Sequence, residues 1–293
     1  MKRVDFHMHT THSDGTYSPA ELMRYCKKKD LACVSVTDHD TMSSFEDCSA
    51  EAKKLGIELV PGIEISAIFE PGTLHILGYF LDRQHPFLKA KLEDIQRARR
   101  DRNPEIVRRL NAVGIDITLD EVHEEALQGD SPDIDTKQVG RPHFAEVLVK
   151  KGVVSNRQEA FKKYLGKGCP AYIDKRRVTG REAIDMIHRA GGVASVAHPK
   201  QMKLEGKRLE AEIAKLAEDG LDGIEVFNSC QNPDDNRIYS RLAQQFNLVR
   251  TAGSDFHGAA KPGVDLGFMG QDIRIGYDMV DALRGRIKFK KAS

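Results

Sequence analysis

Histidine and carboxylate residues occur in short clusters along this chain, and together they could bind divalent metal ions. His7 and His9 are separated by one residue, and Asp255 and His257 repeat that spacing far along the sequence. Mixed imidazole and carboxylate ligands suit Zn, Mn or Fe better than Mg or Ca, which prefer sites built from oxygen. Further candidates of the same two types occur between these pairs: Asp38, His39, Asp40, Glu64, His75 and His198. The candidates outnumber the ligands of one ion, so the pattern predicts two or three divalent ions, with Glu64 as a bridging carboxylate.

Most of these candidates stand at the ends of predicted strands, which must position them. Side chains alternate along an extended segment, so both residues of a His-x-His pair point to the same side. Helices between most of the strands predict parallel pairing and an α/β sheet or barrel, whose carboxyl-end loops converge on one face. The predicted strands are 3–6, 31–37, 57–66, 73–80, 193–197, 223–228 and 248–253.

The predicted helices around these strands have recognisable starts and ends. Ser18 and Thr179 each begin a capping box with Glu three residues later, and Gly56 is placed to end a helix over 45–55. We expect two more helices over 209–219 and 237–246.

The middle of the chain has a different pattern, with helical signals and little strand. The stretch 97–110 is strongly basic, Thr118 and Ser155 begin further capping boxes, and 129–140 is polar and predicted to be a loop. Residues 1–85 and 175–293 are therefore expected to form one discontinuous α/β domain. Residues 86–174 are expected to form a helical insertion that covers the active site.

The composition excludes several classes of function. The 293 residues carry 45 basic and 44 acidic side chains, a net charge of +1, so no global field draws the protein to nucleic acid or anionic membrane. The N-terminus has no signal-peptide pattern, and no apolar stretch approaches a membrane span of about 20 residues. Five scattered cysteines indicate reduced thiols, so we expect a cytoplasmic protein. No obligatory protein partner is inferred from the sequence.

The ordered motifs resemble those of the PHP (polymerase and histidinol phosphatase) superfamily. The resemblance implies a distorted seven-stranded (β/α) barrel that holds a trinuclear metal site. It rests on the segments 5–10, 13–15, 37–40, 62–66, 75–78, 197–199 and 253–257. By the same resemblance the metal ligands are His7, His9, Asp14, His39, Glu64, His75, His198, Asp255 and His257.

The insertion resembles that of bacterial 3′,5′-nucleotide bisphosphate phosphatases, which are related to the RNase AM type of 5′-to-3′ exonuclease. The resemblance lies in the arginines of the basic stretch and in the segments 140–144 and 161–165. It implies that Arg99, Arg102, Arg141 and His143 contact a substrate phosphate, since arginine forks match phosphate oxygens. The alternative for Arg99 and Arg102 is a basic helix face that is merely solvated.

These features predict a hydrolase that cleaves phosphate monoesters of nucleotides. A metal-bound hydroxide held by His7, His9, Glu64 and Asp255 would attack the phosphate. The resemblance of the insertion implies that the substrate is the 3′-phosphate of a 3′,5′-nucleoside bisphosphate, with short 5′-phosphorylated RNA or DNA oligonucleotides as further substrates. Two alternatives remain open: a phosphatase for histidinol phosphate or another small molecule, and a non-catalytic regulatory domain.

Overall fold

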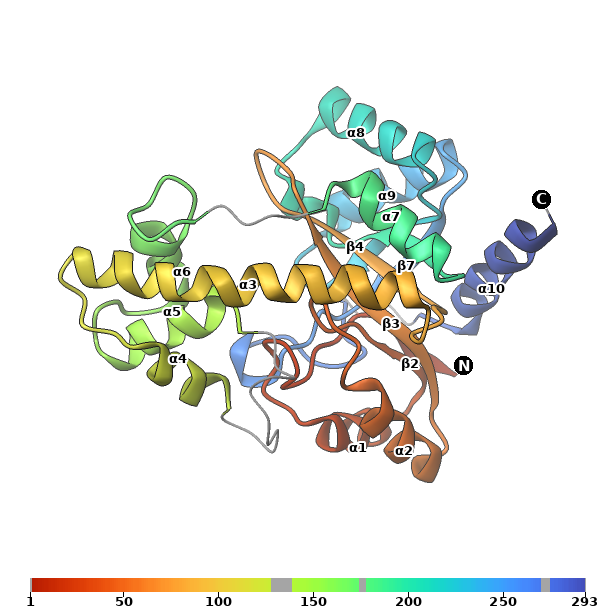
Figure 1. Ribbon diagram of the computed structural model, residues 1–293. Coiled ribbons are helices and arrows are strands. Elements are labelled where there is room, and N and C mark those ends of the chain that lie inside the picture. Colours follow the sequence, from red (N-terminus) through yellow and green to blue (C-terminus); the bar gives the residue numbers. More distant parts are fainter. Residues whose placement is uncertain (1, 128–138, 174–177, 270–274, 293) are drawn as a thin grey trace.

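The computed structural model describes residues 2–127, 139–173, 178–269 and 275–292, and it contains a seven-stranded sheet that curls into a nearly closed barrel (Figure 1). The strands follow one another in chain order around the barrel. They are β1 (Arg3–Asp5), β2 (Leu31–Val36), β3 (Glu58–Ala67), β4 (Leu74–Tyr79), β5 (Val193–Val196), β6 (Gly223–Asn228) and β7 (Val249–Gly253). The segments that follow β1 and β7 meet through a parallel bridge between Met8 and Phe256, which brings the two ends of the sheet together. The expected α/β barrel is thus confirmed.

One strand departs from the parallel pairing that was expected of strands separated by helices. β4 runs antiparallel to both β3 and β5, whereas the other adjacent pairs are parallel. The reason is the connection: only residues 68–73 separate β3 from β4, too few for the crossover that parallel strands need. The reversal still serves the site, because His75 lies near the amino end of β4, at the same edge as the carboxyl ends of its neighbours.

Helices cover the outside of the barrel (Figure 1). α1 (Pro19–Lys28) and α2 (Phe45–Leu55) lie together on one side, and α7 (Gly180–Arg189), α8 (Gly206–Glu218) and α9 (Pro233–Gln245) lie on another. The 3-10 turns η3 (Pro199–Met202) and η4 (Gly258–Ala260) follow β5 and β7. α10 (Tyr277–Ala292), which the sequence analysis did not predict, contributes Met279, Val280 and Leu283 to the cluster inside the strands.

The local helix signals were confirmed at three of the four capping boxes. Ser18, Thr118 and Thr179 each cap a helix with the reciprocal Glu contact. The prediction at Ser155 is wrong, because Asn156 is the N-cap and its side chain accepts from the backbone of Glu159. α9 begins at Pro233, earlier than expected, since Asn232 caps it.

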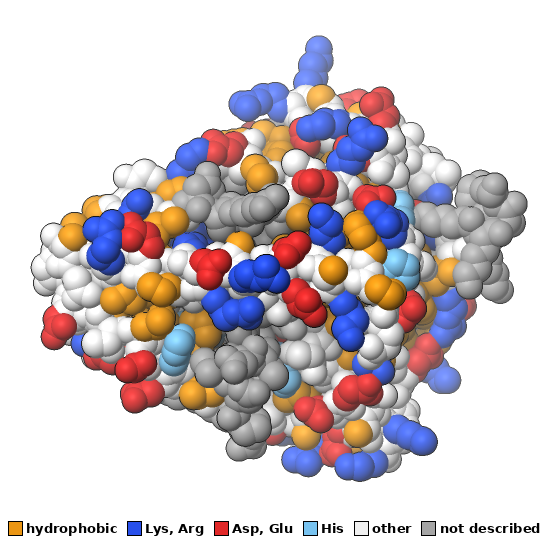
Figure 2. Space-filling model, viewed as in Figure 1, with side chains coloured by type: hydrophobic (Ala, Val, Ile, Leu, Met, Phe, Trp, Pro, Cys, Tyr) orange, Lys and Arg blue, Asp and Glu red, His pale blue; other side chains and the backbone are white. Residues whose placement is uncertain are grey.

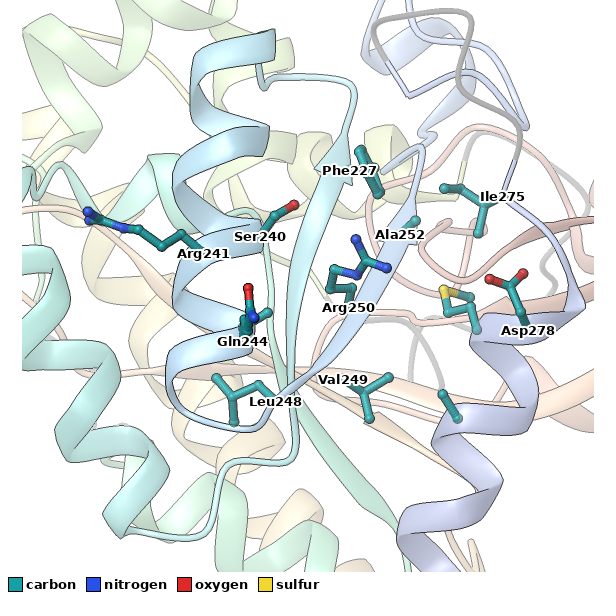
Figure 3. A pocket seen from close by; sticks show the side chains of 13 residues that line it. Phe227, Ser240, Arg241, Gln244, Leu248, Val249, Arg250, Ala252, Ile275 and Asp278 are labelled. Atoms are coloured by element: carbon teal, nitrogen blue, oxygen red, sulfur yellow. The ribbon is translucent and has the colours of Figure 1, made fainter.

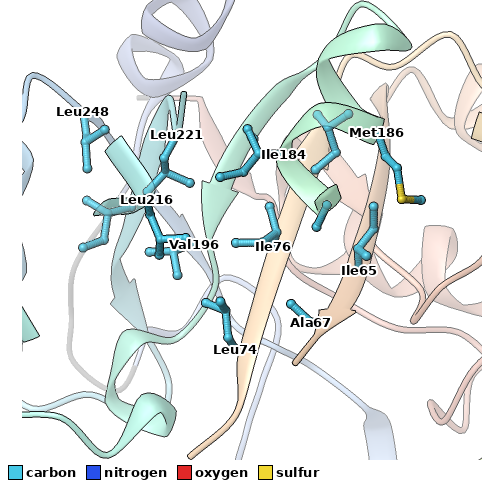
Figure 4. Close-up of a cluster of buried hydrophobic side chains, with 14 of the residues drawn as sticks. Ile65, Ala67, Leu74, Ile76, Ile184, Met186, Val196, Leu216, Leu221 and Leu248 are labelled. Carbon is cyan, nitrogen blue, oxygen red and sulfur yellow. The ribbon is translucent and has the colours of Figure 1, made fainter. Parts of the chain in front are cut away.

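The main hydrophobic cluster lies between the outer face of the sheet and its helices (Figure 4). Ile65, Ile76 and Val196 point from the strands toward Ile184 and Met186 of α7, and all five are buried. Burial of each such side chain stabilises the fold by about 1.5–3 kcal/mol. This packing holds β3 and β4, which contain Glu64 and His75, and β5, which leads to His198.

The insertion comprises α3 (Pro86–Ala112), α4 (Leu119–Ala126), α5 (Arg141–Lys150), α6 (Arg157–Ala160) and the π-helical turn η2 (Phe161–Leu165). It has its own cluster of buried residues, among them Ile106, Phe144 and Leu148. α3 crosses the front of the molecule from the barrel to this cluster, and its first half packs Leu88 and Leu92 against the barrel helices (Figure 1). The boundaries at 86 and 174 stay a prediction, and most of the expected loop 129–140 lies outside the described residues.

Charge is evenly mixed on the face that α3 crosses. Figure 2 shows basic and acidic side chains interspersed there, in keeping with the net charge of +1. No helix in the described part of the chain is long and apolar enough to cross a membrane.

Candidate metal centre

Two short segments carry candidate ligands on one side and apolar side chains on the other. Met8 lies between His7 and His9, and Phe256 lies between Asp255 and His257. Met8 and Phe256 form a backbone bridge and are both buried in the cluster that includes α1. The alternation of extended backbone then directs the four flanking residues away from that cluster, toward the centre of the barrel face.

The backbone around these residues is tightly constrained. A Cβ on Gly253 would lie 2.1 Å from the Cβ of His7, so only glycine allows the two segments to approach so closely. Asp255 has a φ of 56° and His198 a φ of 25°, in the left-handed region that residues other than glycine seldom adopt. Such backbone is often found at functional sites, where surrounding structure fixes it.

Glu64 lies at the centre of the cluster and is fully buried. Its carboxylate oxygens lie within 3.4 Å of ring nitrogens of five histidines. The distances are 3.4 Å to His7 Nε2, 3.3 Å to His9 Nε2, 3.0 Å to His39 Nδ1, 2.9 Å to His75 Nδ1 and 2.9 Å to His198 Nε2. One carboxylate is thus shared by side chains that follow or belong to four different strands, which is the arrangement a bridging ligand needs.

Asp14 organises the outer edge of the cluster. Its carboxylate lies 3.2 Å from His257 Nε2, and 3.8 Å from both His9 Nδ1 and His39 Nε2. The loop that carries Asp14 is held by the buried Asp38, which accepts hydrogen bonds from the backbone and hydroxyl of Thr10 and from the hydroxyls of Ser13 and Ser44. The carboxylate of Asp38 is therefore occupied by the loop.

The donor atoms fit divalent ions. Buried polar atoms that lack a hydrogen bond cost roughly 1–3 kcal/mol each. Six buried atoms of the nine clustered residues lack a well-formed hydrogen bond among the described residues: His7 Nε2, His9 Nε2, His39 Nδ1, Asp14 Oδ1, Glu64 Oε2 and His198 Nδ1. Glu64 Oε2 lies 3.0–3.4 Å from three of these ring nitrogens, so the potential ligand atoms face one another within the cluster.

The potential ligand atoms form four overlapping sets, each with three or four atoms from His, Asp or Glu. Within each set the atoms lie within 4.8 Å of one another. The sets are His9, Asp14, His39 and His257; His7, His198 and Asp255; His7, His9 and Glu64; and His39, Glu64 and His75. All nine residues implied by the resemblance are therefore brought together, and the sharing of His7, His9, His39 and Glu64 suits neighbouring ions.

The charges in the cluster are strongly coupled. Burial by itself raises the pKa of Glu64, but His39, His75 and His7 outweigh it and hold that pKa well below its usual range. Burial lowers the pKa of His9, yet hydrogen bonds and charge from Asp255 and Glu64 raise it to about 10. In His75 burial wins over Glu64 and lowers the pKa to about 4. The cluster thus favours ionised carboxylates that can bind cations.

Two residues of the centre were missed by the sequence analysis. Glu225 of β6 is fully buried, and its carboxylate lies 2.9 Å from His7 Nδ1 and accepts from the backbone N–H of His198 at 2.7 Å. Lys261 Nζ donates to Asp255 Oδ2 at 2.6 Å. Glu225 sits within a strand in the segment GIEVFN, and a carboxylate inside an otherwise apolar strand was the signal that could have revealed it.

A pocket of 180 Å³ adjoins the cluster on the side of the insertion, and we call it the arginine pocket. It combines ligand candidates from the barrel with polar and cationic residues from α3 and α5. Its lining comprises Ser13, Asp14, His39, Ser66, Thr73, His75, Arg99, Arg102, Gly140, Arg141, Pro142, His143 and Phe161. The first turn of α5 therefore faces this pocket, and the partial positive charge of a helix start favours anions.

The four predicted substrate contacts all line the arginine pocket. Arg99 and Arg102 are buried, with exposed fractions of 9% and 6%, so the alternative of a solvated basic face is wrong. Arg99 forms a buried ion pair with Asp40, which places Asp40 outside the metal cluster. Arg141 Nη1 donates to the carbonyl of Leu165 at 3.1 Å, which anchors its guanidinium.

His143 reaches back to the start of its own helix. Its Nδ1 accepts from the backbone N–H of Gly140 at 3.0 Å, so in the neutral imidazole the proton is on Nε2. The imidazole of His143 lines the arginine pocket.

A larger groove lies elsewhere. It measures 920 Å³ and runs between α9, β7 and α10, where Figure 3 shows Gln244, Arg250 and Asp278 along it. None of its lining residues belongs to the histidine cluster. Volume alone therefore does not locate the chemistry, which depends on the convergent donor atoms.

Comparisons with known proteins agree with this geometry. A family model described as the PHP domain matches residues 5–222. A 5′-3′ exoribonuclease of Haemophilus influenzae is 36% identical over 87% of this chain and 90% of its own length. A 3′,5′-nucleoside bisphosphate phosphatase of Chromobacterium violaceum is 31% identical over 91% of each chain.

The fold comparison gives the same answer. A crystal structure from Bifidobacterium adolescentis, proposed to be a metal-dependent phosphoesterase, superposes with a TM-score of 0.83 at 30% identity and covers 97% of this chain and 96% of that one. The candidate cluster of histidines and carboxylates lies on that shared fold. The chain therefore belongs to the PHP domain family, and it is a metal-dependent phosphoesterase, a hydrolase.

Proposed function

We propose that this phosphoesterase removes the 3′-phosphate of 3′,5′-nucleoside bisphosphates and also acts on short 5′-phosphorylated oligonucleotides. The observation that carries the proposal is the arginine pocket, which shares Asp14, His39 and His75 with the metal cluster. One phosphate at the metals and a second among arginines would match a substrate with two phosphates.

The nine clustered residues are proposed to hold two or three ions of Mn, Fe or Zn. Bound ions would activate water and neutralise charge on the phosphate oxygens. The ligands are His7, His9, Asp14, His39, Glu64, His75, His198, Asp255 and His257. The position proposed for the attacking water lies among four of these ligands: His7, His9, Glu64 and Asp255. The Nε2 atoms of His7 and His9 each lie 3.3–3.4 Å from the carboxylates of Glu64 and Asp255.

The insertion supplies the contacts for the second phosphate. Arg141 and His143 start α5, and their donors add to the partial positive charge of the helix start. Arg99 and Arg102 complete the cationic wall, and the ion pair with Asp40 fixes the orientation of Arg99. Charge-assisted hydrogen bonds of this kind each contribute about 1.5–3 kcal/mol.

The protein is proposed to act in the cytoplasm. The five cysteines, Cys26, Cys33, Cys48, Cys169 and Cys230, are all free thiols. This state is typical of reducing compartments.

The test compares substrates on the Mn²⁺-loaded protein. We expect kcat/KM for 3′-phosphoadenosine 5′-phosphate to exceed that for histidinol phosphate and for an aryl phosphate by about 100-fold, because only the bisphosphate reaches both sites. Chromatography of the product should give the nucleoside 5′-phosphate. A preference for histidinol phosphate would support the small-molecule alternative, and metal-loaded protein without phosphate release would support the regulatory one.

A further inference from the structure

The metal cluster borders a second pocket that the proposed reaction of a mononucleotide leaves unused. This pocket measures 250 Å³, and we call it the lysine pocket because Lys261 lines it. It shares five residues with the arginine pocket: Asp14, His39, His75, Pro142 and Phe161. The two pockets therefore lie on either side of a common set of residues, with the ligand candidates between them.

The lining of the lysine pocket suits a nucleotide. Arg157 and Lys261 supply positive charge, Gln201 an amide and Phe161 an aromatic ring. Cationic side chains that follow a phosphate backbone, together with a ring on which a base can stack, are the usual elements of single-strand binding.

The pocket is built jointly by the insertion and the barrel. Arg157 begins α6, and its Nη1 donates to the carbonyl of Ala260 in η4 at 3.1 Å. Its Nε contacts Glu146 of α5, so the guanidinium is held in place between the two parts of the molecule. On the barrel side, Thr73 of the arginine pocket donates to Gln201 Oε1 of the lysine pocket at 3.3 Å.

We propose that the lysine pocket binds the nucleotide that follows the scissile phosphate in a short single-stranded oligonucleotide. The inference rests on the proposed function, in which the arginine pocket holds the 5′-phosphate of the first nucleotide. The chain then runs from the arginines, across the ligand cluster, to Arg157 and Lys261. Its direction is fixed by the 5′-phosphate, so the pocket receives the 3′ side.

Hydrolysis of the oligonucleotide breaks the same type of bond, P–O3′, as hydrolysis of a 3′,5′-bisphosphate. The water oxygen bonds to phosphorus, the P–O3′ bond breaks, and the 3′ oxygen of the departing nucleotide takes a proton from water. With a bisphosphate the products are inorganic phosphate and a nucleoside 5′-phosphate. With an oligonucleotide they are a nucleoside 5′-phosphate and a chain shorter by one residue that carries a new 5′-phosphate. That product can enter the arginine pocket again.

The decisive variant is Arg157→Ala, assayed on Mn²⁺-loaded protein with 3′-phosphoadenosine 5′-phosphate and with a 5′-phosphorylated RNA trinucleotide. We expect the ratio of kcat/KM for the trinucleotide to that for the bisphosphate to fall about tenfold, and Arg157→Lys to restore most of it. Equal losses on the two substrates would overturn the proposal. Lys163→Ala is the matched control, because Lys163 is exposed and pairs with Glu159 without lining either pocket, and we expect the ratio to stay as in the wild type.

Binding gives a second readout that does not depend on turnover. In chelator, the affinity for a fluorescent 5′-phosphorylated hexanucleotide should fall with salt, and Arg157→Ala should flatten the slope of log K against log salt by about 0.7, as expected for one lost phosphate contact on a single strand. An unchanged slope would contradict the proposal. Gln201→Glu, which adds an anion at the pocket, should lower the same substrate ratio, and an unaltered ratio would also count against it.

The wild type separates this inference from the proposed function. Hydrolysis of the bisphosphate without hydrolysis of the trinucleotide would overturn the lysine-pocket proposal and the proposed activity on oligonucleotides, and would leave the proposed 3′-phosphatase activity standing. No hydrolysis of the bisphosphate by metal-loaded protein would overturn both.

Discussion

The barrel face and the insertion hold their polar residues in different ways. On the barrel face, His7 Nε2, His9 Nε2 and His39 Nδ1 are buried and face the carboxylate of Glu64 at 3.0–3.4 Å. In the insertion, Arg99 and Arg141 are already paired with Asp40 and with the carbonyl of Leu165. The first region is prepared for ions, and the second is a stable wall of fixed positive charge. The contrast suggests that the barrel sets the reaction and the insertion selects the substrate.

The variant Glu64→Gln is the strongest test of the idea that the barrel carries out the reaction. Glu64 contacts five histidines, and glutamine keeps its volume but removes the charge that metal ions need. We expect kcat/KM to fall by about 10³-fold or more for every substrate, a loss of about 4 kcal/mol, together with most of the bound metal. Glu58→Gln is the control, because Glu58 lies at the other end of the same strand and pairs with Arg284. Full activity in Glu64→Gln would contradict the central role of this carboxylate.

The insertion should respond selectively to Arg141→Ala. We expect KM for the bisphosphate to rise about 10- to 100-fold, the cost of one charge-assisted hydrogen bond, with little effect on an aryl phosphate that has no second phosphate. Steady-state kinetics on both substrates measures this. Arg109→Ala is the matched control, since Arg109 also donates to a backbone carbonyl, that of Tyr172, but does not line the pocket. Equal effects of Arg141→Ala on the two substrates would remove its role in selection.

The smallest effect is expected at Glu225, which tests how the barrel ligands are positioned. Its carboxylate orients His7 and receives the backbone N–H of His198. Such partners of metal-binding histidines contribute roughly 10-fold or more to metal affinity. Glu225→Gln should therefore weaken metal binding about tenfold and lower kcat at limiting metal, with activity recovered at high Mn²⁺. A kcat loss that excess metal does not rescue would assign Glu225 another role.

The sequence was informative where chemistry depends on strand ends. His7, His9, Asp255 and His257 could be placed because alternation and parallel strands bring such residues to one face. The reversal of β4 was missed because His-containing apolar strands look alike in either direction, although the short connection from β3 to β4 held the information. Ser155 was misassigned because its neighbour Asn156 is an equally good N-cap. In the structure, it is the Asn156 side chain that accepts from the backbone of Glu159.

Other features depend on packing that no local pattern encodes. Glu225 was missed because a single carboxylate within a strand acquires its role only when β5, β6 and the segment after β1 meet. The burial of Arg99 follows from its pairing with Asp40, which is 59 residues away in the sequence. The lysine pocket likewise joins α6 to η4, which are about 100 residues apart.

The most direct test of the account is a metal titration of chelated protein, with phosphate release from 3′-phosphoadenosine 5′-phosphate measured against the number of ions bound per chain. Chelation should abolish release, and activity should return in step with the uptake of two or three Mn²⁺ ions. Full phosphate release by protein that retains less than about one ion per ten chains would contradict the proposed role of the barrel cluster.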